Sequence, residues 1–77
     1  MSPSKAKKDF GATHYLTTSD GVTPTMYYKK VTTNFSDGTS FTGWAYLSFA
    51  NLWQNSDVNT RNRNERKKFE RQLVKIK

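Results

Sequence analysis

The chain has 77 residues, enough for one small domain, and it has no cysteine that could form a disulfide or a thiolate zinc site. Thirteen Lys and Arg residues against six Asp and Glu residues give a formal net charge of +7. This charge favours a polyanionic partner and excludes a protein that imitates the acidic surface of DNA.

Residues 1–11 are predicted to form a flexible basic arm. The segment contains Pro3, two serines and three lysines without any hydrophobic periodicity. Such an arm is either a solvated terminus or a basic segment that touches phosphates. It lacks the apolar core of a signal peptide, and no apolar run approaches the roughly 20 residues that span a bilayer. We therefore expect a cytoplasmic, intracellular protein with no membrane contact.

Residues 13–47 are predicted to form a three-stranded antiparallel meander. Ser-Asp-Gly occurs at residues 19–21 and again at 36–38, and Asp-Gly between segments rich in Thr, Tyr, Val and Phe is a strong hairpin signal. The predicted strands therefore cover residues 13–18, 25–35 and 39–47. Pro24 must lie at the start of the second strand or on an edge, because it cannot donate a hydrogen bond to the ladder.

The second turn also predicts a register. A three-residue loop with Gly38 in the left-handed conformation places Lys30 opposite Trp44 and Val31 opposite Gly43. Because side chains alternate, one face then carries an apolar set suited to a core: Tyr27, Val31, Phe35, Phe41, Ala45 and Leu47. The other face carries Tyr28, Lys30, Thr32, Asn34, Thr42, Trp44 and Tyr46. A two-residue loop would mix the two sets, so we favour the longer loop.

The last part of the chain is predicted to be helical. Residues 48–57 are ambiguous between a short helical turn and an extension of the third strand. Residues 57–77 contain no Gly or Pro and are rich in good helix formers, so they predict one amphipathic helix. Its apolar stripe is formed by Val58, Phe69, Leu73 and Ile76. The predicted fold is α+β, in one domain over residues 12–77: a three-stranded antiparallel meander packed against one C-terminal amphipathic helix.

Signals for catalysis and for metal binding are nearly absent. The chain has one histidine, His14, and no nucleotide-binding, metalloprotease or nucleophile motif. Asp20 and Asp37 are explained by the turns in which they lie. We therefore expect a protein that is not an enzyme, with no catalytic residues, no metal site and no cofactor.

The basic face of the predicted helix is the main functional signal. Arg63, Lys67, Arg71 and Lys75 recur at every fourth residue, and Lys68 flanks them. A face that only maintains solubility usually mixes both signs of charge. A row of cations of one sign can neutralise successive phosphates and release their counterions. These five residues are the predicted phosphate contacts.

The second candidate surface is the sheet face that carries Tyr28, Lys30 and Trp44. Exposed aromatic rings beside a lysine can stack on unpaired bases, and Lys29 is a further cation in the same strand. The alternative is that these rings form a second core layer, covered by residues 48–57 or by another subunit. If exposed, the same face is also suited to a protein partner or to a homodimer.

Together these signals predict a non-catalytic nucleic-acid-binding module for DNA or RNA, with low sequence specificity and a steep dependence on salt. The alternative is a small protein-binding regulator or inhibitor, which would set the aromatic sheet face and the basic helix against an acidic partner protein. A three-stranded sheet on one helix also occurs in DNA-binding domains that insert the sheet into the major groove, but that likeness concerns the fold alone.

Overall fold

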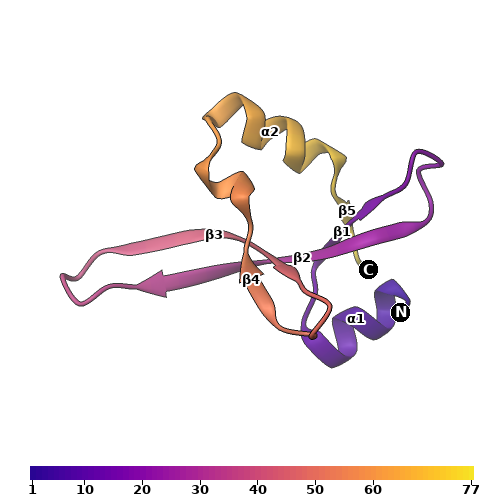
Figure 1. Cartoon of the computed structure of the whole chain (residues 1–77), viewed down its shortest axis with the longest axis horizontal. Coiled ribbons are helices and arrows are strands. Elements are labelled where there is room, and N and C mark those ends of the chain that lie inside the picture. Colours follow the sequence, from indigo (N-terminus) through magenta and orange to yellow (C-terminus); the bar gives the residue numbers. More distant parts are fainter.

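The computed structural model describes all 77 residues and contains one antiparallel sheet with a helix on each face (Figure 1). The sheet has five strands in the order β4-β3-β2-β1-β5. Their bounds are β1 His14–Thr17, β2 Pro24–Asn34, β3 Ser40–Leu47, β4 Trp53–Asn55 and β5 Val74–Lys75. The helices are α1 Pro3–Phe10, the 3₁₀ helix η1 Asp57–Thr60 and α2 Arg63–Gln72. The α+β class is confirmed, whereas the predicted three strands and one helix become five strands and two α-helices.

Residues 1–11, predicted to be a flexible arm, contain α1. Ser2 caps the helix by accepting a hydrogen bond from the Lys5 N–H (3.3 Å), and Pro3 occupies its first position. Gly11 ends it with a φ of 75°, which is the usual left-handed glycine at a helix end. The segment therefore holds both end signals of a helix, although it lacks a clear hydrophobic period.

Two hydrogen bonds and one buried side chain hold α1 against the sheet. Ala6 is fully buried in a cluster that includes Tyr27. The Tyr27 hydroxyl donates to the Met1 carbonyl (2.8 Å), and the Trp53 indole N–H donates to the Phe10 carbonyl (3.0 Å). The helix is thus attached at both of its ends, which the predicted flexible arm would not be.

The predicted register of the β2–β3 hairpin is confirmed. Lys30 lies opposite Trp44 and Val31 opposite Gly43, and Gly38 has a φ of 89° in the loop. Residues 48–57, which the sequence left ambiguous, form a tight turn, then β4 and the first residue of η1.

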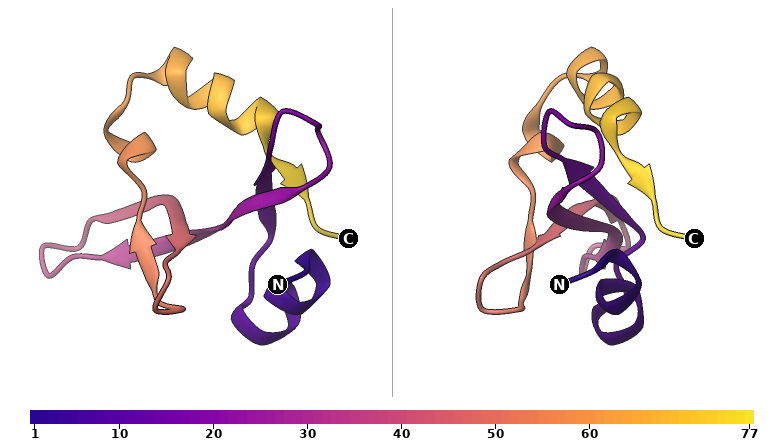
Figure 2. Two further views of the ribbon diagram at one scale, coloured as in Figure 1. Left: turned by 45° about the vertical axis from the view of Figure 1, so that its right-hand side comes forward. Right: turned by 90° about the vertical axis from the view of Figure 1, so that its right-hand side faces the viewer.

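The outer half of this hairpin projects away from the rest of the molecule (Figures 1 and 2). Strand β1 pairs with β2 only as far as Tyr28, and β4 pairs with β3 only from Ala45 onward. Residues 31–43, which we call the hairpin extension, therefore pair only with each other. The apolar face predicted as the core is consequently buried only near its base, while Phe35 and Phe41 are 51% and 43% exposed.

Residues 57–77 form η1, α2 and β5 rather than one helix. The Asn62 side chain caps α2 by accepting a hydrogen bond from the Glu65 N–H (2.9 Å). At Leu73 the backbone becomes extended, and the chain then pairs with β1, where the Ile76 N–H donates to the Thr13 carbonyl (2.9 Å). Pairing with a distant strand, rather than a local stop signal, ends the helix.

Two hydrophobic clusters lie on opposite faces of the sheet. The cluster beneath α1 contains Ala6, Ala12, Tyr27, Leu47 and Ile76. The cluster beneath α2 and η1 contains Tyr28, Trp44, Val58 and Phe69. The predicted apolar stripe is therefore wrong for Ile76, because β5 carries that residue to the other face of the sheet.

Candidate nucleic-acid interface

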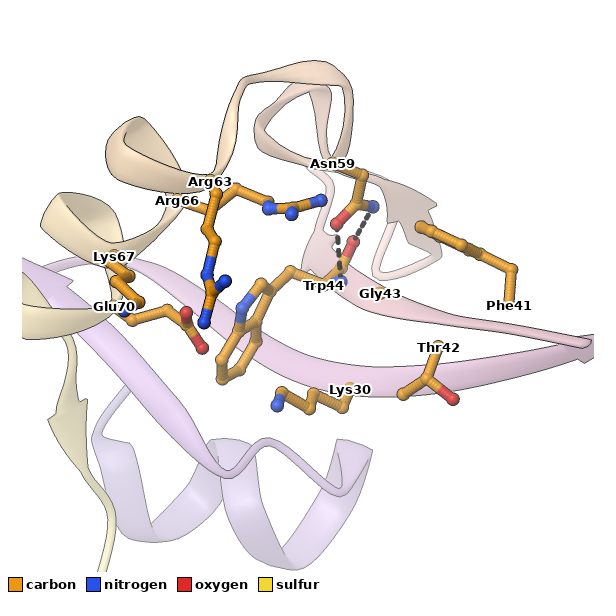
Figure 3. A pocket seen from close by; sticks show the side chains of 10 residues that line it. All are labelled: Lys30, Phe41, Thr42, Gly43, Trp44, Asn59, Arg63, Arg66, Lys67 and Glu70. Carbon is orange, nitrogen blue, oxygen red and sulfur yellow. Dashed lines mark hydrogen bonds between the residues drawn. The ribbon is translucent and has the colours of Figure 1, made fainter.

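A groove of about 340 Å³ runs between α2 and the base of the hairpin extension (Figure 3). Its charged lining consists of four cationic side chains and one anionic side chain: Lys30, Arg63, Arg66, Lys67 and Glu70. The strand wall is formed by Phe41, Thr42, Gly43 and Trp44, and Asn59 of η1 closes one side. The lining therefore has a formal surplus of three positive charges.

Helical periodicity explains why α2 presents this set. Arg63, Arg66, Lys67 and Glu70 are spaced i, i+3, i+4 and i+7, so they lie on one face of the helix. Phe69 lies on a neighbouring face and is buried against the sheet. Docking of Phe69 thus sets the rotation of the helix and turns the basic face toward the groove.

The floor beneath α2 is a cluster of aromatic rings. Phe69 meets the rings of Tyr28 and Trp44 edge to face, with centroids 5.0 and 6.0 Å away. Tyr28 is 8% exposed and Trp44 is 6% exposed. Both were candidate base-stacking residues, and this burial corrects that prediction, because their own helix covers the faces that a base would need.

An amide side chain locks the edge of β3 at the groove. Asn59 accepts a hydrogen bond from the Trp44 N–H (2.9 Å) and donates one to the Trp44 carbonyl (2.8 Å), replacing a strand partner where β4 has ended. A Cβ on Gly43 would lie 2.5 Å from Cε2 of Phe41 and 2.8 Å from Oδ1 of Asn59. The glycine therefore lets Asn59 and the Phe41 ring approach the backbone closely.

The two neighbouring lysines of β2 lie on opposite faces of the sheet. Lys30 points into the groove, with its Nζ 5.2 Å from the centroid of the Trp44 ring. Lys29 lies on the α1 side, with its Nζ 4.6 Å from the Trp53 ring. The structure therefore separates Lys29 from the predicted helix contacts.

Only part of the predicted row of basic residues lies in the groove. Lys68 lies outside it, with its Nζ 3.8 Å from a carboxylate oxygen of Glu65, and Arg71 is exposed but does not line it. Lys75 belongs to β5, so the predicted row of basic residues along the helix ends at Arg71. Arg66 lines the groove and was not predicted, although its i+3 spacing from Arg63 was the signal that would have found it.

A second hollow of about 520 Å³ continues the groove along β1 and β5. Lys30, Trp44 and Glu70 line both hollows, and Lys75 lies in the second. Lys75 thus returns to the basic surface from a strand rather than from the helix.

His14 also lines the second hollow. Its ring nitrogen Nδ1 lies 2.8 Å from Thr13 Oγ1, and its ring meets Trp44 edge to face at 5.2 Å. Burial, followed by the charges of Lys75 and Lys30, lowers the pKa of His14 below 6.5. At neutral pH the imidazole is therefore uncharged and adds nothing to the positive surface.

The structure contains no cluster of three or more His, Cys, Asp or Glu side chains that could hold a metal ion. None of its helices combines the length and the apolar character needed to cross a membrane. Comparisons of the chain with protein-family models, curated proteins and solved structures find no match. The function is therefore inferred from the geometry of the groove.

Proposed function

We propose that this protein is a non-catalytic nucleic-acid-binding module that holds phosphates in the groove between α2 and the hairpin extension. The observation that carries the proposal is the convergence of four cations, Lys30, Arg63, Arg66 and Lys67, from two elements of the fold. None of them forms an ion pair within the chain, whose ion pairs are Arg61–Asp57 and Lys68–Glu65. Their charges remain available to an external anion.

The arrangement suits a chain of phosphates better than a single anion. The groove continues past Lys30 toward Lys75, so positive side chains follow one another along a path instead of surrounding a point. For each phosphate that the protein neutralises, the slope of log K against log salt concentration becomes more negative by about 0.9 for duplex DNA and by about 0.7 for single strands. Four contacts therefore predict a slope of about −3 to −4.

The proposal is tested by fluorescence anisotropy with mixed-sequence oligonucleotides, single-stranded and duplex, over a range of salt concentrations. The groove variant replaces Arg63 and Arg66 with alanine. The matched control replaces Lys7 and Lys8, two exposed residues of α1, and removes the same charge on the other side of the sheet. We expect the groove variant to make the slope shallower by about 1.4 to 1.8 and the control to change it much less. Equal losses in both variants, or no binding by the unmodified protein at low salt, would overturn the proposal.

The alternative of a protein-binding regulator loses one of its two surfaces. It required an exposed aromatic sheet face, and Tyr28 and Trp44 are buried beneath α2. The basic helix remains as a surface for an acidic protein. Competition by polyglutamate separates the two ideas, because polyglutamate supplies the charge without nucleotides and should displace an oligonucleotide only weakly.

A further inference from the structure

Phe41 is an apolar side chain placed on the wall of a charged groove. It is 43% exposed and belongs to neither hydrophobic cluster of the protein. Figure 3 shows its ring on the strand side of the groove, across from Arg63 and Arg66 of α2. The core does not account for this ring, so its presence calls for another explanation.

The ring of Phe41 also lies against the backbone of Gly43. Its Cε2 atom would lie 2.5 Å from a Cβ on Gly43, so the ring edge occupies the space that any other residue at position 43 would fill. Glycine two positions along the strand thus gives the ring a flat backbone surface on which to rest.

We propose that the groove binds an unpaired nucleic-acid strand, with Phe41 stacking on a base while the groove cations hold the adjoining phosphates. This inference rests on the proposed function and specifies its substrate class. Proteins that bind single strands combine a positive track for the backbone with aromatic rings for successive bases. A duplex keeps its bases stacked inside, so it can use the cations but offers Phe41 no base.

Phe35 supplies a second ring on the same face of the hairpin extension. Phe41 pairs with Thr33 in the ladder, so Phe35 is its diagonal neighbour, at a distance of about 7–8 Å between such positions. Phe35 is 51% exposed, and no other element of the chain pairs with this part of the hairpin. The hairpin extension therefore carries two open, neighbouring rings on the sheet face opposite to Lys30, and of the two only Phe41 lines the groove.

The test compares a single strand and a duplex of the same sequence in three variants. Phe41→Leu removes the aromatic ring but keeps apolar volume, Phe41→Tyr keeps the ring, and Phe49→Leu is the matched control. Phe49 is likewise exposed but lies in the turn between β3 and β4, outside the groove. Circular dichroism confirms that each variant is folded.

We expect the unmodified protein to prefer the single strand. Phe41→Leu should weaken single-strand binding by about 5- to 100-fold and leave both the duplex affinity and the salt slope unchanged, since no charge is lost. Phe41→Tyr and Phe49→Leu should resemble the unmodified protein. If Phe41→Leu has no larger effect than Phe49→Leu, or weakens duplex binding equally, the stacking role is wrong while phosphate binding stands. If the unmodified protein binds neither form, the proposed function itself fails.

Discussion

The side-chain amide of Asn59 stabilises the edge of β3, and replacing it with alanine should lower the free energy of unfolding by about 2–3 kcal/mol. Two hydrogen bonds to the Trp44 backbone are lost, each with a net contribution of about 0.5–1.5 kcal/mol. The Trp44 carbonyl keeps a bond from the Ser56 N–H (3.0 Å). The Trp44 N–H would lose its partner in a partly buried position. Because an unsatisfied buried donor is costly, losing this hydrogen bond should cost about 1.5 kcal/mol, the upper end of the range for one bond.

Gly43→Ala should act through the same amide. The new Cβ would lie 2.8 and 2.9 Å from two atoms of Asn59, so the amide must move away from Trp44. The third close atom belongs to the ring of Phe41, which is exposed and can rotate aside. We expect Gly43→Ala to cost about 2 kcal/mol alone and almost nothing after Asn59→Ala, because alanine is also favoured over glycine in a strand by about 0.5–1 kcal/mol.

Urea unfolding followed by tryptophan fluorescence measures this coupling in the parent, the two single variants and the double variant. Asn64→Ala, at an exposed position of α2, is the control for loss of an asparagine. The double variant should be more stable than the sum of the single effects predicts, by about 2 kcal/mol. If the two effects are additive, or if Asn59→Ala unfolds with a free energy within about 0.5 kcal/mol of the parent, the proposed stabilisation of the β3 edge by Asn59 is refuted.

Three further perturbations test other parts of the fold. Phe69→Ala should lower the free energy of unfolding by about 3–5 kcal/mol, seen in thermal melts, because the ring is buried between two aromatic rings. Lys75→Gln should raise the pKa of His14 toward 6.5 in an NMR titration, and an unchanged pKa would contradict their proximity. Hydrogen bonds from the Thr18 hydroxyl and then from Thr23 lower the pKa of Asp20. The charged Asp20 therefore stabilises the folded protein fully at pH values above its unfolded pKa of 3.8, and this stabilisation is lost as the pH falls below that value. Asp20→Asn should therefore flatten the loss of stability between about pH 4 and pH 2 in urea unfolding.

The β2–β3 hairpin could be predicted from the sequence because its determinants are local. The Asp37 carboxylate accepts hydrogen bonds from the N–H and hydroxyl of Thr39 (2.9 and 2.6 Å), and Gly38 adopts the left-handed conformation. Both features lie within the loop that sets the register. Once the loop length is chosen, the antiparallel ladder determines every pair along the two strands, and alternation determines the face of each side chain.

The first helix was missed although its end signals are in the sequence. Pro3 and Gly11 stand at the positions where helices commonly begin and end, but each residue is equally common in loops. The single apolar contact of its interior is Ala6, a side chain too small to produce a visible hydrophobic period. Tertiary attachment at Tyr27 and Trp53 completes the stabilisation of α1, and no local pattern encodes it.

The end of α2 was missed for the opposite reason. Residues 73–77 continue the composition of a helix, with no Gly or Pro to stop it. In the structure their hydrogen bonds go instead to β1, which lies about sixty positions earlier in the chain. Ile76 thereby becomes buried on the α1 side of the sheet. A competition between a local helix and a distant strand is decided by the whole fold.

The placement of the aromatic residues follows from where the sheet is covered. Alternation correctly assigned Trp44 to one face and Phe41 to the other, but it does not say how far along a strand the neighbouring elements extend. At the base of the hairpin both faces of the sheet are covered, so Trp44 is buried. In the hairpin extension no other strand pairs with β2 or β3, and Phe41 is exposed. The exposed ring therefore comes from the face predicted as the core.

Arg63 and Lys67 needed no such correction, because the period of the helix places them on one face wherever it docks. Base stacking is thus proposed at Phe41, beside the cations that the helix period already predicted.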